Sequence, residues 1–299
     1  MLALVLIPVA LGIGLIMSVF DDDDSLDAAE QGTPVPAETD LALVQEDANS
    51  TDSFEGSNAA ERMVGNDNGT EILGFGGDDI IEGNGGDDAI DAGSGDDTVN
   101  AGAGDDFAVG GTGDDRVILG DGNDIYSASS LNSEYMEGDD FVRGGAGDDV
   151  IRDYHGSNVL RGDLGNDFLF SGDDDPFAQR GTNADLGKSD TLHGGFGNDT
   201  LNGDDGDEFT GGAGVDQFGI GVSLDRDEDE VTITDLDPTT EELVLYVQNP
   251  VDPTSQDLRV TLRSAGNGVD VLLGNRLVAT LANLGPNDIG NINVAVVLT

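Results

Sequence analysis

The 299-residue sequence predicts an all-β fold: a right-handed parallel β-roll solenoid with a C-terminal antiparallel β capping domain and an N-terminal membrane-spanning or signal-like helix. Three observations predict it. A nine-residue phrase rich in glycine and aspartate recurs through residues 65–219, alternating apolar runs fill residues 220–299, and residues 1–20 carry no charge. The short period decides the architecture, because such repeats bury their apolar faces only by stacking on one another.

The first twenty residues, 1–20, are uncharged and long enough for one membrane span. A cleaved signal peptide would show a basic start and a small-residue cleavage site, and neither is evident. An uncleaved anchor that ends at the four aspartates 21–24 is therefore favoured, and a cleaved signal stays open as the alternative. Because no basic residue flanks the segment, the sequence does not predict its orientation.

Residues 21–64 are expected to form an acidic, disordered linker between this segment and the repeats. The stretch combines Asp, Glu, Ser and Thr with Pro34 and Pro36 and has few large apolar residues. Burial therefore cannot offset the entropy of ordering it. A short helix around Leu41–Gln45 would be marginal on its own.

The nonapeptide can be interpreted place by place from Gly74 onward. Its first four places are mostly glycine, which suits a tight turn with positive φ. Its last three places form a very short strand with one inward side chain, as at Ile81, Ile90, Val99 and Val117. Two nonapeptides then complete one lap, and successive laps stack as parallel strands about 4.8 Å apart with right-handed winding.

The sixth place of the repeat is almost always aspartate, and every second repeat lies on the same edge of the roll. Carboxylates stacked about 5 Å apart repel by roughly 1 to 3 kcal/mol per pair. Calcium, which accepts six or more oxygen ligands in flexible geometry, would relieve this better than magnesium. Zinc would need His or Cys, and the chain has two histidines and no cysteine. The predicted ligands of several Ca²⁺ ions are Asp79, Asp88, Asp97, Asp106, Asp115, Asp124, Asp140, Asp149, Asp167, Asp190, Asp199, Asp207 and Asp216.

Residues 65–219 resemble the glycine- and aspartate-rich repeats of the RTX family (hemolysin-type calcium-binding repeats), with the pattern G-G-x-G-x-D-x-U-x. The segments 144–151 and 194–201 match it best. The resemblance implies a parallel β-roll, calcium in the turns and export from a Gram-negative bacterium. In the family the C-terminal region carries an uncleaved type I secretion signal, and residues 229–245 are similar to the segment that follows the repeats in exported relatives. Export through that signal or through residues 1–20 stays open.

The repeats are interrupted at several points. Thr70 replaces the first sixth-place aspartate, and Asn158 is a weaker, neutral substitute farther on. About seven extra residues follow Ser127, the register breaks again around Asp173–Asp190, and the copy that ends at Thr210 is one residue short. The insertions near 128–134 and 176–184 are interpreted as loops that a solenoid tolerates, with a recognition surface as the alternative.

From Ile220 onward glycine becomes rarer and period-2 apolar runs predict antiparallel strands. Gly274–Asn275 between two runs indicates a hairpin turn. A domain here would cover the open end of the solenoid, whose strand edges would otherwise pair with another chain. The predicted strands are Val231–Thr234, Leu243–Val247, Leu258–Leu262, Val269–Leu273, Leu277–Leu281 and Val294–Leu298.

The composition limits the possible functions. Eleven basic against sixty-two acidic residues give a formal charge of −51, which argues against nucleic acid as a partner. The absence of cysteine leaves stabilisation to calcium rather than disulfides. No H-E-x-x-H helix or G-x-S-x-G elbow is present, and Gly181–Ser189 has one residue too many for a P-loop. His155 and His193 are far apart in sequence, and His193 is expected on the surface.

The sequence therefore predicts a non-enzymatic calcium-binding protein of the exterior or cell surface that folds on binding calcium. A structural or adhesive role is favoured, with a membrane contact through residues 1–20. The alternative is an accessory or carbohydrate-binding subunit of an exported polysaccharide-modifying or hydrolytic enzyme, with cell-surface polysaccharide as its partner. A hydrolase with an unfamiliar site is a weaker third hypothesis.

Overall fold

The computed structural model describes residues 41–45, 53–128, 138–154, 156–172, 189–204, 206–223, 230–248, 258–266 and 268–298. The predicted helix 1–20 and the insertions near 128–134 and 176–184 lie wholly or almost wholly outside the described residues, so those predictions stay open. Among the residues that are described, no helix is long and apolar enough to cross a membrane.

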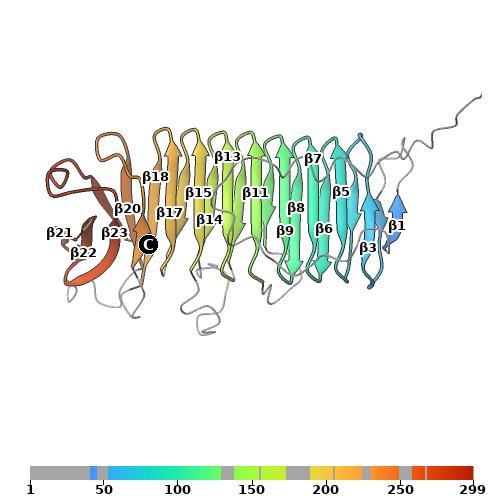
Figure 1. Cartoon of the computed structure of the whole chain (residues 1–299), viewed down its shortest axis with the longest axis horizontal. Helices are drawn as coiled ribbons and strands as arrows, with labels where there is room; N and C mark the ends of the chain where they lie inside the picture. The colour runs from blue at the N-terminus through green and yellow to red at the C-terminus, as the bar shows by residue number, and fades with distance from the viewer. Residues whose placement is uncertain are drawn as a thin grey trace, which may run out of the picture. The chain divides into compact units, whose positions relative to one another are not determined.

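Two β-sheets make up the described part of the chain, and consecutive strands alternate between them up to β20 (Figure 1). The first sheet has the spatial order β1 (Ala42–Gln45), β3 (Glu61–Val64), β5 (Ile80–Gly85), β7 (Thr98–Ala103), β9 (Arg116–Asp121), β11 (Phe141–Ala146), β13 (Val159–Leu164), β15 (Thr191–Phe196), β17 (Glu208–Ala213), β19 (Val231–Ile233), β23 (Arg276–Leu281), β22 (Gly268–Leu273) and β21 (Val260–Ala265). The second has the order β2 (Ser53–Glu55), β4 (Glu71–Leu73), β6 (Ala89–Ser94), β8 (Phe107–Thr112), β10 (Ile125–Ser127), β12 (Val150–Asp153), β14 (Phe168–Ser171), β16 (Thr200–Gly203), β18 (Gln217–Val222), β20 (Glu242–Val247) and β24 (Val294–Leu298). We call the parallel strands β1–β20 with β24 the roll, and the antiparallel strands β21–β23 the cap.

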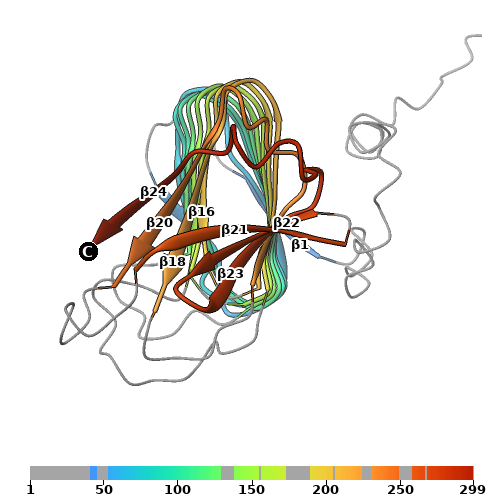
Figure 2. The same cartoon turned by 90° about the vertical axis from the view of Figure 1, so that its left-hand side faces the viewer.

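The register confirms that two nonapeptides make one lap. Ile81 pairs with Val99 and Val99 with Val117, eighteen residues apart each time. Figure 2, which looks along the stack, shows the laps superposed. Val117 pairs next with Val142, so this lap is seven residues longer, as the insertion after Ser127 predicts. Leu192 pairs with Phe209, seventeen residues on, which confirms the short copy. The right-handed sense of the winding stays a prediction.

The core of the roll is narrow, because each short strand contributes one or two inward side chains. The predicted inward residues Ile81, Ile90, Val99 and Val117 are all at most 1% exposed. Larger side chains fill the same place in other laps, among them the fully buried Tyr126. The inward and outward alternation follows from the period of two along a strand.

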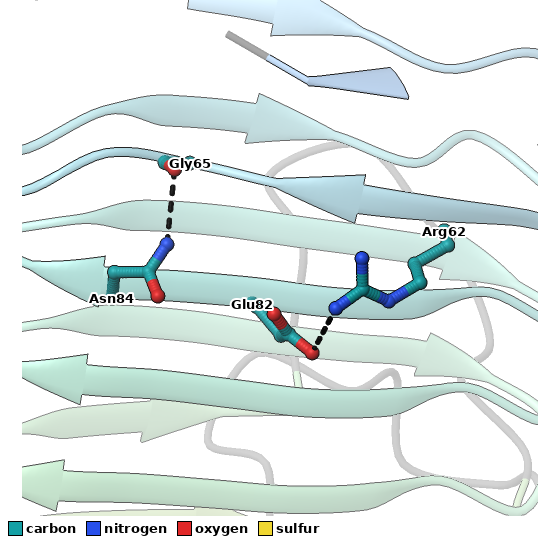
Figure 3. A network of polar contacts seen from close by, with 4 residues as sticks. All are labelled: Arg62, Gly65, Glu82 and Asn84. Carbon is teal, nitrogen blue, oxygen red and sulfur yellow. Dashed lines mark hydrogen bonds and ion pairs between the residues drawn. The ribbon is translucent and has the colours of Figure 1, made fainter. Parts of the chain in front are cut away.

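The second place of the repeat needs a positive φ, and this explains one of its glycines. At Gly102 φ is +118° and an added Cβ would lie 2.1 Å from the carbonyl oxygen of Asn84 in the previous lap. Asn84 itself holds φ +79° without being glycine, which asparagine tolerates better than most residues. Its amide donates to the Gly65 carbonyl at 3.0 Å, beside the Arg62–Glu82 ion pair of 2.7 Å (Figure 3).

The predicted linker boundary at residue 64 is wrong for its last part. Strands β1, β2 and β3 already belong to the two sheets: β1 pairs with β3 in parallel, and β2 pairs with β4. The segment 42–45 is therefore a strand and not a helix. Met63 is fully buried, and Val44 and Phe54 pack against the core. These few apolar residues cover the first lap, which a count of large apolar residues over the whole stretch overlooks.

At the other end, the six predicted strands are found, but the predicted change to antiparallel pairing at Ile220 is wrong. Strands β19, β20 and β24 pair in parallel with their neighbours and continue the roll. Antiparallel pairing is confined to the cap, where Leu273 faces Arg276 across the predicted Gly274–Asn275 turn. A period of two fits both directions of pairing, so the sequence pattern could not distinguish them.

Candidate metal centre

The sixth-place aspartates form two columns, one at the amino ends of the strands of each sheet. In each column, Oδ1 of one aspartate accepts a hydrogen bond from the main-chain N–H of the equivalent residue one lap earlier. Asp97 accepts from Asp79 at 2.7 Å and Asp106 accepts from Asp88 at 2.7 Å. The first column is Glu61, Asp79, Asp97, Asp115, Asp140, Asn158, Asp190 and Asp207. The second column is Thr70, Asp88, Asp106, Asp124, Asp149, Asp167, Asp199, Asp216 and Glu241.

The thirteen predicted ligands therefore all lie in these columns, and each side chain is at most 8% exposed. Their assignment as ligands is a prediction. In most of them the second oxygen, Oδ2, is buried and makes no hydrogen bond to the protein. An isolated buried charge of this kind is costly, and buried polar atoms without partners indicate an absent ligand or ion. The residues with such an Oδ2 include Asp79, Asp97, Asp106, Asp115, Asp124, Asp149, Asp167, Asp199 and Asp216.

Glycine at the first place of the repeat leaves room for this oxygen. A Cβ added at Gly110 would lie 2.5 Å from Oδ2 of Asp115, and one added at Gly194 would lie 2.4 Å from Oδ2 of Asp199. In these two turns a side chain at the first place would fill the space beside the oxygen. Ala92, Ala101 and Leu119 occupy the first place before Asp97, Asp106 and Asp124, so glycine there is not a requirement of the repeat. The second-place glycine is favoured for its positive φ.

Burial changes the acidity of the columns. It raises the pKa of Asp97 to about 7 and that of Asp149 to about 8, although the main-chain hydrogen bond to each carboxylate lowers it. Burial and then the charge of Asp140 raise the pKa of Asp115 further above the usual range. Without a counter-charge these carboxyl groups would carry protons near neutral pH, and a divalent cation competes with those protons.

The fifth-place residues form a second ladder, exposed and opposite in direction. Oδ1 of Asp78 accepts from the N–H of Asp96 one lap later at 3.2 Å, and Asp87 accepts from Asp105 at 3.0 Å. In each turn the fifth-place carboxylate therefore accepts from the next lap, and the sixth-place carboxylate accepts from the previous lap. The outer ladder leaves its carboxylates in water, so it does not require a cation.

Calcium fits the inner columns by its donor preference. Over the described ranges, no three side chains of Asp, Glu, His or Cys are grouped so that they alone could hold a metal. A site in the columns would combine a carboxylate oxygen with main-chain carbonyls of the turns. Calcium accepts such mixed oxygen sets in flexible geometry, and zinc does not.

Two ligand candidates have an Oδ2 that the protein itself satisfies. The hydroxyl of Tyr126 donates to Oδ2 of Asp140 at 3.0 Å, and the Ser171 hydroxyl donates to Oδ2 of Asp207 at 3.0 Å. Asp153, only 1% exposed, also bonds Asp140 through its side chain. These two aspartates therefore have less to offer a cation than their neighbours in the same column, which the repeat pattern alone does not indicate.

Each column has at one end a glutamate that the repeat pattern did not predict. Glu61 begins the first column, and its own carboxylate accepts from the N–H of Ser57 at 2.7 Å. Glu241 ends the second column, where it accepts from the N–H of Asp216. Burial raises the pKa of Glu241 to about 7. Glu61 lies eighteen residues before Asp79, so the lap length could have placed it in the first column.

Comparison with protein families matches four segments, 73–108, 101–132, 136–175 and 186–218, to the RTX calcium-binding nonapeptide repeat. These segments carry the two columns over most of their length. The chain carries RTX repeats. Its RTX repeats indicate calcium binding.

Comparison with curated proteins gives no match. Among solved structures, the chain matches the extracellular lipase LipA from Serratia marcescens with 15% identity and a TM-score of 0.24. The match covers 85% of this chain and 42% of the lipase, so the chain spans less than half the length of that protein. A similarity this low supports no conclusion about activity.

Proposed function

We propose that the RTX roll binds several calcium ions in its turns, that this binding drives its folding, and that the chain acts as a structural or adhesive part of an exported or surface-tethered protein. One observation carries the proposal: buried carboxylates stand in columns, and in most of them one oxygen has no partner in the protein. The RTX repeats supply the chemical identity of the missing partner.

The residues that would hold calcium are the column aspartates with an unpartnered Oδ2, together with carbonyls of the glycine-rich turns. In each, Oδ1 already fixes the carboxylate by accepting a main-chain N–H, as Asp115 does for Asp97 at 2.9 Å. When bound, calcium supplies the positive charge that offsets the burial of these carboxylates. Asn158, a neutral residue in the column, keeps the main-chain hydrogen bond from Asp140 at 2.8 Å but lacks the charge.

The test is circular dichroism of the purified full chain during calcium titration and after chelation with EDTA. Strand content should rise cooperatively with calcium and fall after chelation, because binding energy to a site absent in the unfolded chain becomes folding energy. Magnesium at the same concentration is the control, and it should restore less structure because it requires a stricter geometry. Unchanged strand content in metal-free buffer at about pH 8 would contradict the proposal.

The remaining functional assignments rest on the sequence. Export, by residues 1–20 or by a C-terminal signal, and tethering to a membrane are both proposals of this kind. The expectation that the chain is not an enzyme is supported by the structural role that RTX repeats generally have. Blank assays on ester, glycoside and peptide substrates would support it further.

A further inference from the structure

The outer face of the second sheet is hollowed where four neighbouring strands, β14, β16, β18 and β20, approach their carboxyl ends. The cavity has a volume of about 370 Å³. It adjoins the first column at one point, because its lining includes Ser171, whose hydroxyl donates to Oδ2 of Asp207 at 3.0 Å. Pockets of this size and larger bind small molecules in other proteins.

Glycines form the floor of the cavity. On β18 the outward residues Gly219 and Gly221 replace side chains. A Cβ added at Gly219 would lie 1.9 Å from Oδ1 of Asn202 and 2.8 Å from the ring of Tyr246, so both of these side chains converge over it. A Cβ at Gly221 would instead meet its nearest neighbour, Asp204, at an ordinary 3.4 Å, and there the floor is open.

Aromatic rings stand on both sides of this floor. Phe170 comes from β14 and Tyr246 from β20, strands that lie three spacings of about 4.8 Å apart. Tyr154 supports Phe170 from outside the cavity, with ring centroids 5.4 Å apart. Arg152 lies over the ring of Phe168 at 5.2 Å, so that ring is already stacked. Phe170 and Tyr246 thus remain as the rings for a ligand.

The polar side chains of the lining are the amides of Asn202 and Gln248, the carboxylate of Asp204 and the hydroxyls of Ser171 and Tyr246. The Ser171 hydroxyl already donates to Asp207. An amide both donates and accepts hydrogen bonds, and a carboxylate accepts two. None of the described residues that line the cavity is basic. The chain has a formal charge of −51, which disfavours an anionic ligand. A pyranose has an apolar C–H face and an edge that carries hydroxyls. Aromatic rings can stack on that face, and amides and carboxylates can hydrogen-bond those hydroxyls.

We propose that this cavity binds an uncharged pyranose unit of a neutral polysaccharide. Phe170 and Tyr246 stack on the sugar, and Asn202, Gln248 and Asp204 hydrogen-bond its hydroxyls. The cavity and the calcium columns use different side chains, so the proposal can fail while calcium-coupled folding holds. If calcium-coupled folding fails instead, circular dichroism of the same samples shows it.

Isothermal titration of the calcium-loaded full chain with cellohexaose tests this, because its equatorial hydroxyls leave both faces of each ring flat. Maltohexaose is the second neutral probe, an oligouronate the anionic one and tetramethylammonium the cationic one. Binding of a neutral hexaose, and of neither charged probe, is expected. Binding of only a charged probe, or of none of the four, would overturn the proposal.

Variants locate the binding. Phe170→Ala and Tyr246→Ala should each weaken binding roughly tenfold, and Gly221→Leu should abolish it by filling the open floor. Phe107→Ala is the matched control, since Phe107 is an outward aromatic of the same sheet, 42% exposed, outside the cavity. It should leave binding unchanged. Circular dichroism at the same calcium concentration identifies any variant that fails to fold. If Gly221→Leu does not fold, Phe170→Ala still tests the site. Equal losses in Phe107→Ala and Phe170→Ala would overturn the assignment.

Discussion

In the roll, buried carboxylates stack on one another, whereas in the cap the buried carboxylate has an arginine. Residues 74–128 contain fourteen acidic residues and one basic residue, and residues 258–281 contain one acidic residue and three arginines. Asp270 of the cap is 5% exposed and accepts from Nε of Arg263 at 3.1 Å. Asp97 of the roll has a main-chain N–H on one oxygen and no partner on the other.

The difference shows that two parts of one continuous sheet depend on different conditions. In the cap, Arg263 offsets the charge of the buried Asp270, so the stability of the cap is not expected to require an ion from solution. Among the described residues of the roll, no basic side chain offsets Oδ2 of residues such as Asp97, so under the proposed function its stability is expected to depend on calcium and on pH. A protein built in this way is expected to remain unfolded over most of its length until calcium is available.

The largest expected effect is the loss of the roll when calcium is removed. Hydrogen exchange measured by segment in EDTA at about pH 8 should show amides of β5–β18 losing protection by orders of magnitude, because the columns then carry uncompensated charge. Strands β22 and β23 of the cap should lose less. Uniform loss of protection in both regions would show that the roll and the cap do not differ in their dependence on calcium.

The next effect is a pH dependence whose sign separates the two regions. In the metal-free roll, burial raises the pKa of Asp106 and Asp167 to about 7 from 3.8. The folded state then holds protons that the unfolded state has released, so the stability of the metal-free roll is greatest below about pH 4 and is lost as the pH rises through about 7.

Thermal melts in EDTA at about pH 5 and pH 8 should therefore show a higher Tm at pH 5. Repeating the melts with saturating calcium provides the control. There the difference in Tm between pH 5 and pH 8 should become smaller or change sign, because protons compete with calcium. A metal-free protein that is more stable at pH 8 would contradict the assignment of buried, unpaired carboxylates.

A smaller effect distinguishes the inner column from the outer ladder within one turn. Asp97→Asn keeps the shape and the hydrogen bond of Oδ1 but removes the charge, and it should raise the calcium midpoint roughly tenfold and reduce cooperativity. Asp78→Asn is the matched control, since Asp78 is exposed and only accepts from Asp96. Calorimetric calcium titration measures both, and equal shifts would overturn the division into inner and outer acids.

The smallest effect concerns the turn backbone of the roll. Phe75 holds φ +70° and is 48% exposed, so it carries the strain of a bulky residue in a place that most repeats give to glycine. Phe75→Gly should stabilise the calcium-loaded roll by about 1 kcal/mol, the low end of such strain. Asn84→Gly should show no gain, because asparagine tolerates this φ and its side chain bonds Gly65. Chemical denaturation of both variants measures the difference.

Much of the site could be predicted because its geometry repeats. The eighteen-residue lap puts Asp79, Asp97 and Asp115 in one column and Asp88, Asp106 and Asp124 in the other, as the structure has them. Beyond Ser127 the laps differ in length, so the later aspartates do not follow from a fixed spacing. What could not be predicted were the places where another lap supplies a partner. Tyr126 satisfies Asp140, fourteen residues away, and Ser171 satisfies Asp207 across an insertion. Neither pairing follows from the spacing of the repeat.

The sequence by itself determined the lap, its core and the two acidic columns, because glycine, aspartate and one apolar residue at fixed places allow only one local conformation. Only the tertiary structure decided where the roll ends. Strands β1, β2 and β3 join it because an open first lap offers them strand partners. Strands β19, β20 and β24 continue it in parallel because the neighbouring strand sets the direction of pairing. Alternating apolar residues look the same in parallel and antiparallel strands. They predict which face of a strand is buried, but not which strand pairs with it.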